Sequence, residues 1–529
     1  MKIYNKLIIP AFCTLALAGC DLDKFPESST VTEDQKKEVV EGRPEMLEAD
    51  VNGLYSGMIK YNLLGKSSPN HYDFGYAALC LALESNGQDM VASTAGFNWF
   101  ASPMLYTDRN FSSEWTTFIW KTFYNQIKTA NDILAVVPKD TKDETLKVYR
   151  GQALTARAFD YLHLVQLFQF TYKGHEDAPA VPIVTETMTV EETKSNPRAT
   201  VKAVYELIMS DLNEAIGLLD GYSRATKDQI NQQVAYGLRA RANLLMQNWA
   251  AAASDADAAM AGFAPYSLAE VSQPTFNDAS ASSWIWGNIV TVNNDIVITG
   301  ILNWPSHLCS MTGNGYTTLT NTWRYINQNL WEKIPAGDIR KSWWVDKDLK
   351  SKLTDNMIVG STPAAKYFSW EPYVNVKFGA YQSIPGNTTN ASDWPVMRVE
   401  EMILIKAEGL AMSGNVGEAK SVLESFVKEN RNPEYTCTAA SPEALQEEIW
   451  FQRRIELWGE GFAFLDLMRL KKPVNRIENG VSNYPVSARF NVDAESDIFL
   501  YRIPEREIQV NDGISAEDNN KVVEPPVGK

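Results

Sequence analysis

The chain has 529 residues, of which 45% are hydrophobic and 22% charged, and its formal net charge at pH 7 is −16. This balance is that of a globular protein and excludes an intrinsically disordered chain. The negative charge, with no Lys/Arg-rich run to offset it, argues against a nucleic-acid partner, whose phosphates would be repelled. The length allows several domains or one large core.

The first twenty residues predict an exported lipoprotein. Lysines precede an apolar run over residues 7–18, which has the shape of a secretory signal and is too short to span a bilayer. The run ends in a stretch that resembles the lipobox of bacterial lipoproteins, Leu17-Ala18-Gly19-Cys20. We therefore expect residues 1–19 to be a signal peptide and Cys20 to carry the lipid that anchors the protein to a membrane.

Cysteine and histidine usage indicates neither a metal site nor a disulfide framework. Past the lipobox three cysteines remain, which allow one disulfide at most and leave open whether it forms: Cys80, Cys309 and Cys437. No CxxC or HExxH motif occurs, and the 4 histidines lie far apart in the sequence. We expect each histidine to be packed or solvated, and we expect no metal and no cofactor.

Helical periodicity dominates both ends of the chain. From Trp115 to Val137 apolar residues recur every three or four positions, and a second such stripe runs over residues 154–168. Similar pairs of stripes follow at 204–219 with 234–245 and at 399–413 with 416–430, and Ser441-Pro442 has the N-cap and first-turn proline of another helix.

A weak internal repeat links the two helical parts. Asn248-Trp249 followed by Ala252 matches Asn415-Val416 followed by Ala419. The pattern resembles the tetratricopeptide helix–turn–helix, in which small residues allow close helix packing. It predicts stacked helical hairpins.

The segment between the helical parts, about 263–396, has a different composition. It holds nine of the 15 tryptophans among Gly, Pro, Asn, Ser and Thr, with no sustained helical stripe. We predict long loops and short strands here, and a second loop-like tract at about 64–114 that includes Phe97 and Trp99. Loops on a rigid scaffold are where binding surfaces usually lie.

The loop-like aromatic residues are candidates for binding a ligand, because flat rings offer large apolar faces for contact. Most tryptophans are core residues, and we expect this of those in helical patterns, which are Trp115, Trp120, Trp249, Trp450 and Trp458. Among the aromatic residues in loop-like sequence we expect a few to face ligand, and the candidates are Trp99, Trp284, Trp286, Trp304, Tyr316 and Trp323.

The order of motifs along the chain resembles the SusD family, also called RagB/SusD. Early features are the lipobox, Trp120-Lys121-Thr122-Phe123-Tyr124 and Ala156-Arg157-Ala158-Phe159. The most specific block comes late, and it comprises Arg398-Val399-Glu400-Glu401, Lys406-Ala407-Glu408, Arg453-Arg454-Ile455-Glu456-Leu457, Glu460-Gly461, Phe464-Leu465-Asp466-Leu467 and Tyr501-Arg502-Ile503-Pro504. Phe462 departs from the pattern where many members have a basic residue, and Asp512 departs where a proline is usual.

This resemblance implies a mostly α-helical fold, in which tetratricopeptide-like hairpins support an irregular ligand-binding part. It implies a lipoprotein on the outer face of the outer membrane of a Gram-negative bacterium. Such a protein captures a glycan and delivers it to a SusC-like TonB-dependent transporter, without catalysis. We expect an N-terminal part over 20–262 and a C-terminal part over 263–529 that form one compact unit. Near-helical spacing of Arg453, Glu456, Glu460 and Asp466 predicts ion pairs between helices.

Two other functions are compatible with the same sequence. A lid of a peptide importer, or of another non-carbohydrate importer, would share the resemblance. An exported glycoside hydrolase would need two carboxylates held about 5–10 Å apart across a cleft, and no pair of carboxylates is singled out. The chain also has no Gly-x-Ser-x-Gly elbow.

Overall fold

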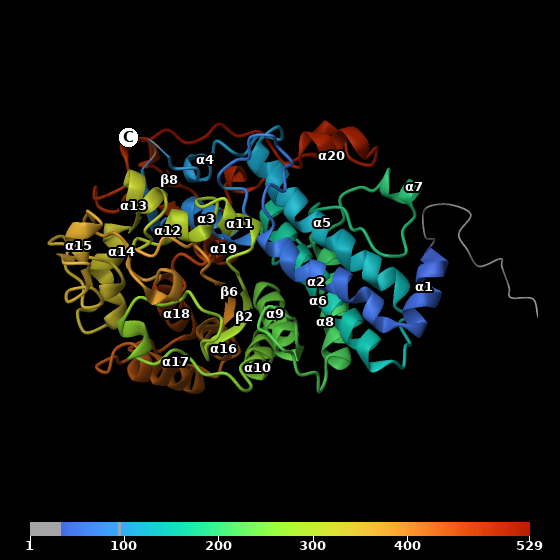
Figure 1. Cartoon of the computed structure of the whole chain (residues 1–529), viewed down its shortest axis with the longest axis horizontal. Helices are drawn as coiled ribbons and strands as arrows, with labels where there is room; N and C mark the ends of the chain where they lie inside the picture. Colours follow the sequence, from blue (N-terminus) through green and yellow to red (C-terminus); the bar gives the residue numbers. More distant parts are fainter. Residues whose placement is uncertain (1–32, 94–96) are drawn as a thin grey trace, which may run out of the picture.

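The computed structural model describes residues 33–93 and 97–529. One end of the elongated molecule is a bundle of long helices, and the other end is built mainly of loops with short helices and strands (Figure 1). The predicted signal peptide, residues 1–19, and the predicted lipid attachment at Cys20 lie outside the described residues. Among those residues, none of the helices combines the length and the apolar character needed to cross a bilayer.

The helices predicted from periodicity are confirmed. They are α5 (Glu114–Val136), α6 (Glu144–Phe168), α8 (Val201–Leu218), α9 (Gln232–Leu245), α16 (Val399–Met412), α17 (Val416–Asn430) and α18 (Pro442–Glu456). Polar caps fix several of their starts. Asp143 accepts a hydrogen bond from the Leu146 amide at the start of α6, and Ser441 accepts one from the Ala444 amide at the start of α18.

The repeated hairpins pack directly on one another. The first is α9 with α10 (Trp249–Ala259), the second is α16 with α17, and α10 packs on α16. Gly409 of α16 is needed at this contact, because a Cβ atom there would lie 2.5 Å from the carbonyl oxygen of Trp249. The predicted stacking of helical hairpins is therefore present, with the two repeated units in contact.

The remaining elements are short. The helices are α1 (Glu33–Gly42), α2 (Glu48–Ser56), α3 (Tyr76–Asn86), α4 (Ala101–Leu105), α7 (Val190–Thr193), α11 (Asp295–Ile298), α12 (Trp304–Leu308), α13 (Tyr316–Thr320), α14 (Gln328–Lys333), α15 (Ala364–Tyr367), α19 (Ala463–Arg469) and α20 (Glu505–Val510). The strands form antiparallel pairs, which are β1 (Met90–Ala92) with β3 (Arg324–Ile326), β2 (Trp284–Asn288) with β6 (Trp394–Arg398), β4 (Ile358–Val359) with β5 (Thr362–Pro363), and β7 (Val474–Asn475) with β8 (Asn491–Val492).

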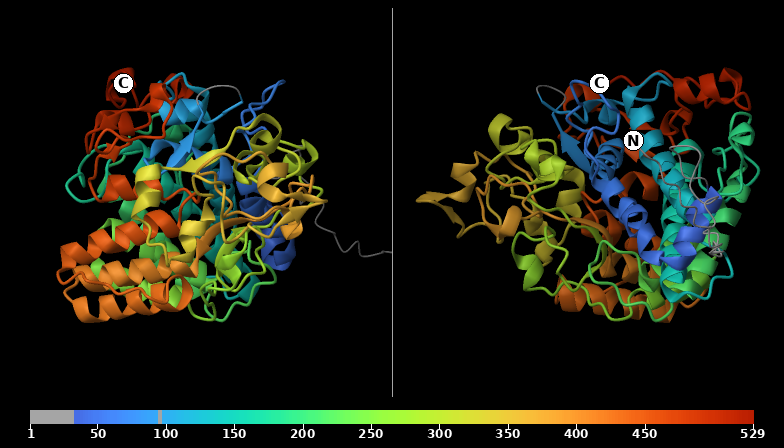
Figure 2. Two further views of the ribbon diagram at one scale, coloured as in Figure 1. Left: turned by 90° about the vertical axis from the view of Figure 1, so that its left-hand side faces the viewer. Right: turned by 45° about the vertical axis from the view of Figure 1, so that its right-hand side comes forward.

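The predicted loops and short strands of the middle segment are thus confirmed, with short helices added. This segment projects from the helical body, as the rotated views show, and the β4–β5 hairpin lies near its tip (Figure 2). The helix α3 is a departure from the prediction of a loop-like tract at 64–114. Every residue of α3 is buried, so it has no polar face and leaves no amphipathic stripe in the sequence.

The tryptophans of the middle segment form core rather than surface. The pair β2–β6 is buried along its whole length, and one hydrophobic cluster extends from Val40 to Ile514. Eight of the nine tryptophans in the segment are buried members of this cluster: Trp284, Trp286, Trp304, Trp323, Trp343, Trp344, Trp370 and Trp394. The large indole side chains fill the interior of this segment, where longer helices and sheets would otherwise supply aliphatic side chains.

The predicted ion pairs are confirmed and buried. Arg453 Nε lies 2.7 Å from Asp466 Oδ2, and Lys377 Nζ lies 2.7 Å from Glu460 Oε1. Glu456 is fully buried and pairs with three guanidinium groups, those of Arg340, Arg398 and Arg431. Such pairs orient helices but do not mark a reaction site by themselves. Cys80, Cys309 and Cys437 are buried free thiols, which settles the disulfide question that the sequence left open.

Candidate functional site

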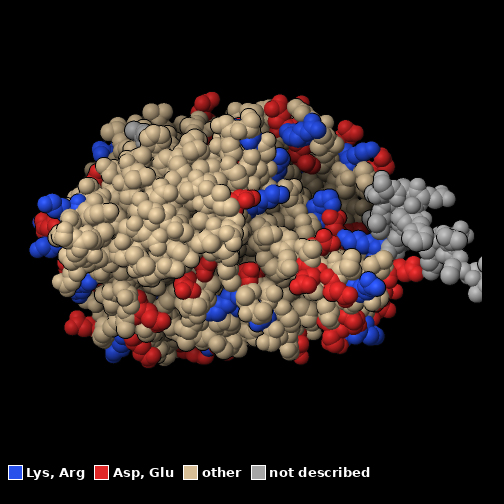
Figure 3. Space-filling view, in the orientation of Figure 1, with Lys and Arg blue, Asp and Glu red and all other residues tan. Residues whose placement is uncertain are grey.

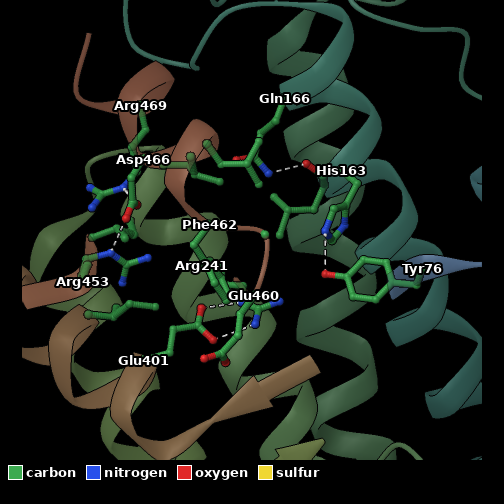
Figure 4. Close-up of a pocket in the computed structure, with 16 residues that line it drawn as sticks. Tyr76, His163, Gln166, Arg241, Glu401, Arg453, Glu460, Phe462, Asp466 and Arg469 are labelled. Carbon is green, nitrogen blue, oxygen red and sulfur yellow. Dashed lines mark hydrogen bonds and ion pairs between the residues drawn. The ribbon is translucent and has the colours of Figure 1, made fainter. Parts of the chain in front are cut away.

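A pocket lies between α6, α9, α16 and α19, and charged groups are among the residues that line it (Figure 4). Its walls hold the Arg241–Glu401 pair, in which Nη2 and Oε2 are 2.7 Å apart, and the Arg453–Asp466 pair. The cavity volume is about 50 Å³. A ligand pocket typically measures about 300–1,000 Å³, so this cavity has room for water and not for a sugar.

Four of the tryptophans predicted to face ligand are buried and cannot contact one, so the prediction is wrong for these four residues. Trp284, Trp286, Trp304 and Trp323 are each at most 1% exposed. Three of the indole N–H groups are bonded inside the protein. Trp284 donates to the Tyr266 hydroxyl, Trp286 to the Asp228 carbonyl and Trp304 to the Ser392 carbonyl. These side chains fill the core, where loops without long helices need large apolar groups.

The remaining two candidates, Trp99 and Tyr316, meet in one aromatic cluster with His71 and Phe97. The rings of His71 and Trp99 are stacked, with centroids 4.6 Å apart and planes inclined by 17°. Tyr316 lies 5.8 Å from His71 and 5.7 Å from Phe97, centroid to centroid. Its hydroxyl is in hydrogen-bond contact with Nδ1 of His71. We call these four side chains the aromatic cluster.

The aromatic cluster is open to solvent through Phe97, whose side chain is 54% exposed. Trp99 and His71 are half-buried, whereas Tyr316 is 6% exposed and supports the ring of Phe97 from below. A large exposed ring that is held from below by other aromatic residues is a rigid apolar platform. Sugar rings stack on such platforms.

Neighbouring backbone and side chains fix the cluster in place. The antiparallel pair β1–β3 ends just before residues 97–99. Asn98 is buried, and its Oδ1 accepts hydrogen bonds from the Phe100 amide and from Nη2 of Arg324. On the other side, His307 stacks on Tyr316 with centroids 4.9 Å apart. Nε2 of His307 lies 3.0 Å from the backbone oxygen of His71.

The titratable groups of the cluster are neutral at pH 7. Burial lowers the pKa of His71 and lowers that of His307 well below its ordinary value, while burial raises the pKa of Tyr316. The aromatic cluster contains no carboxylate that could act as a nucleophile or general acid. Within residues 33–93 and 97–529, no three His, Cys, Asp or Glu side chains gather to hold a metal ion. This arrangement can bind and orient a ligand.

Sequence reasoning passed over His71, His307 and the role of Phe97. The two histidines are packed imidazoles, as expected, but they pack beneath the platform. Phe97 was visible in the loop-like tract, and its position two residues before Trp99 was the available signal. Nothing in the sequence brings residues 71, 97–99 and 316 together, because β1 and β3 come from distant parts of the chain.

Comparisons with known proteins agree with this architecture of helical hairpins joined to a loop-rich segment. Residues 75–244 match a family model described as "Starch-binding associating with outer membrane", and residues 316–520 match the model of the SusD family. The chain belongs to the SusD family. Proteins of this family are binding proteins associated with the outer membrane, and the predictions of a mostly helical fold and of no enzymatic activity are confirmed.

Individual relatives are distant but cover nearly the full length. SusD-like protein P2 of Formosa agariphila is 24% identical over 547 residues, which is 97% of this chain and 99% of the relative. A SusD-like carbohydrate binding protein from Bacteroides vulgatus superposes with a TM-score of 0.71 at 23% identity and covers 90% of this chain and 98% of that one. A sugar binding protein of the same organism gives a TM-score of 0.67 at 23% identity, covering 90% and 97%.

Proposed function

We propose that this protein is a surface lipoprotein of the outer membrane that binds an oligosaccharide or polysaccharide at the aromatic cluster and delivers it to a partner TonB-dependent transporter. The observation that carries the proposal is the exposed ring of Phe97, which packs on Tyr316 in the same cluster as the half-buried Trp99. Membership of a sugar-binding family gives the ligand class. Of the ligand-binding residues predicted from the sequence, the proposed site keeps Trp99 and Tyr316, and it adds Phe97 and His71.

Delivery requires release, so modest affinity suits this platform. A few aromatic contacts supply binding energy without burying the ligand in a deep pocket. The cluster holds no paired carboxylates, so a hydrolytic role has no support in its geometry.

The binding proposal is tested by calorimetry against a panel of soluble glycans, with F97A and W99A beside the unaltered protein. Each substitution removes a ring of the platform, and we expect the affinity for the bound glycan to fall at least about tenfold, or ~1.4 kcal/mol. The matched control is W249A, because Trp249 is also half-buried but lies at the start of α10 in the helical scaffold. Circular dichroism verifies that all variants are folded.

Three outcomes would contradict the proposal. Equal affinity for glycan in F97A, W99A and W249A would remove the cluster as the site. Reducing ends released by the purified protein would indicate a hydrolase. Binding of peptides with no binding of glycans would favour the lid of a peptide importer.

The anchor and the partner are tested separately. Mass spectrometry of the N-terminal peptide is expected to find Cys20 acylated, and an unmodified Cys20 in the purified membrane protein would refute the anchor. Purification from outer membranes is expected to retain a TonB-dependent transporter, and its absence after mild crosslinking would refute the partner.

A further inference from the structure

We infer that the ligand of the aromatic cluster is an uncharged glycan, one without uronic acid, sulfate or phosphate groups. This inference rests on the proposed function and adds the chemical class of its ligand. Its basis is the surface around the cluster, which is almost free of charge in a protein whose net charge is −16.

The absence of charge begins in the sequence. Across residues 279–323 the single Asp, Glu, Lys or Arg residue is Asp295, and across 372–392 it is Lys377. Lys377 is fully buried and ion-paired with Glu460, so it presents no charge to solvent. Charged residues make up 22% of the chain, and their scarcity in these two segments is a local property.

The fold joins these segments beside the cluster. The Gly313 amide donates to the Asn387 carbonyl at 2.8 Å, and the Gly386 amide donates to the Met311 carbonyl at 2.8 Å. Asn390 Nδ2 donates to the Gly300 carbonyl at 2.9 Å and also to the Asn314 carbonyl, two residues before Tyr316. The chain segments 297–301, 311–322 and 384–390 are therefore joined to one another and adjoin the aromatic cluster through Tyr316.

We define the uncharged face as residues 97–102, 291–294, 296–301, 313–321 and 384–389; Asp295, which is exposed between two of these segments, is not part of it. Figure 3 shows a broad face without Lys, Arg, Asp or Glu over α12, α13 and the adjoining loops, whereas charged side chains crowd the helical end. Exposed side chains of the face include hydroxyl and amide groups beside apolar ones: Thr291, Asn293, Leu319, Thr320, Asn321 and Thr388. Neutral hydroxyls and amides match the hydroxyl rim of a sugar, and apolar groups match its C–H faces.

The cations near the platform are not available to an anionic ligand. Arg324 lies beneath the cluster, but its side chain is fully buried and its guanidinium group lies over the ring of Phe100 at 5.5 Å. Lys66 is already paired with Glu114, with Nζ and Oε1 2.6 Å apart. A carboxylate or sulfate on this face would lose hydration without gaining a counter-charge, and the net negative charge of the protein would repel it.

The test measures binding to glycans that differ only in charge. Soluble neutral polysaccharides (glucans, mannans, galactans, arabinans and unsubstituted xylans) and acidic ones (polygalacturonate, alginate and sulfated galactans) are compared by calorimetry at 50 and 500 mM NaCl. The neutral glycan that binds is then carboxymethylated and measured again. We expect binding to the neutral form, a loss of at least about tenfold on carboxymethylation, and little change of affinity with salt.

The outcomes separate this inference from the proposed function. Binding of an acidic glycan that is weakened by F97A or W99A and by salt would overturn the uncharged class and leave the binding site standing. Failure of every glycan to bind, or binding indifferent to both substitutions, would overturn the proposed function and this inference with it. As a positive control, T388K places a cation on the uncharged face, and we expect it to restore salt-dependent binding of the carboxymethylated glycan.

Discussion

At the scale of single residues, Glu456 shows how a charge is kept inside this protein. Its carboxylate is fully buried. It accepts hydrogen bonds from Nε of Arg431 at 2.8 Å, from Nη1 of Arg340 at 3.4 Å and from Nη1 of Arg398 at 3.5 Å. The guanidinium groups outweigh the cost of burial and hold the pKa of Glu456 well below its ordinary value of 4.5. Removing this one anion would leave the three buried guanidinium groups with fewer carboxylate partners, which are Asp338, Glu400 and Glu460.

The substitution E456Q is therefore expected to lower the free energy of unfolding by about 3–5 kcal/mol, measured by urea unfolding at pH 7. Because the pKa of Glu456 is depressed in the folded state, its stabilising effect is present above pH 4.5 and is lost as the pH falls further. The difference from the unaltered protein should thus shrink in acid. The control E443Q alters an exposed glutamate of the same helix and should cost under about 0.5 kcal/mol. Equal loss in both variants would contradict the role of the network.

Residue type alone could not separate the aromatic cluster from the core. Trp99 and Trp323 both stand in loop-like sequence, but Trp323 is fully buried and Trp99 is half-buried. The difference arises from the pairing of β1 with β3, because Trp323 immediately precedes β3 and lies inside, whereas Trp99 follows β1 and is close to the exposed Phe97. Such long-range pairing leaves no trace in the local sequence. Arg453 and Asp466, by contrast, lie on the consecutive helices α18 and α19, and the short turn between these helices brings the two side chains into the predicted ion pair.

At the scale of elements, the amphipathic helix α5 was predictable and the short, fully buried helix α3 was not. α5 buries one face and exposes the other, so its stripe is visible in the sequence. α3 is buried on all sides and contacts the turn that follows α18. The carboxylate of Glu84 in α3 accepts hydrogen bonds from the Gly461 amide at 2.8 Å and from the Phe462 amide at 3.1 Å. Burial raises the pKa of Glu84 to about 7.

Gly461 is the point where this turn meets α3. Its φ is +95°, and a Cβ atom would lie 2.9 Å from the Cβ of Cys80. We expect G461A to lower the free energy of unfolding by about 2–5 kcal/mol, because overpacking of about 1–3 kcal/mol adds to the cost of about 1–2 kcal/mol for a left-handed alanine. Thermal and urea unfolding measure the loss.

Gly414 provides the matched control for this prediction. Its φ is +91°, close to that of Gly461, but a Cβ atom there would have no neighbour within 4 Å. G414A should therefore cost only the conformational part, about 1–2 kcal/mol. If the two variants lost equal stability, close packing of the turn on α3 would not be what requires Gly461.

At the scale of the whole molecule, distant parts of the chain share one core. The hydrophobic cluster includes residues from Val40 to Ile514, and Arg241 of α9 donates to both oxygens of Glu401 on α16. Near the end of the chain, the Tyr501 amide donates to the carbonyl of Leu167 in α6. The uncharged face therefore rests on a scaffold to which both ends contribute, and this favours a binding surface of fixed shape.

We propose that residues 20–262 and 263–529 fold as one cooperative unit, since the shared core leaves neither part a complete interior of its own. Scanning calorimetry of the mature protein is expected to show one transition whose calorimetric and van't Hoff enthalpies agree. Residues 263–529 expressed alone should lack β2–β6 contacts with α9 and should show no cooperative transition. R241A, which leaves Glu401 buried without its partner, should lower the single melting temperature without splitting the transition. Two resolved transitions, with the lower one alone shifted by R241A, would show instead that the parts are independent domains.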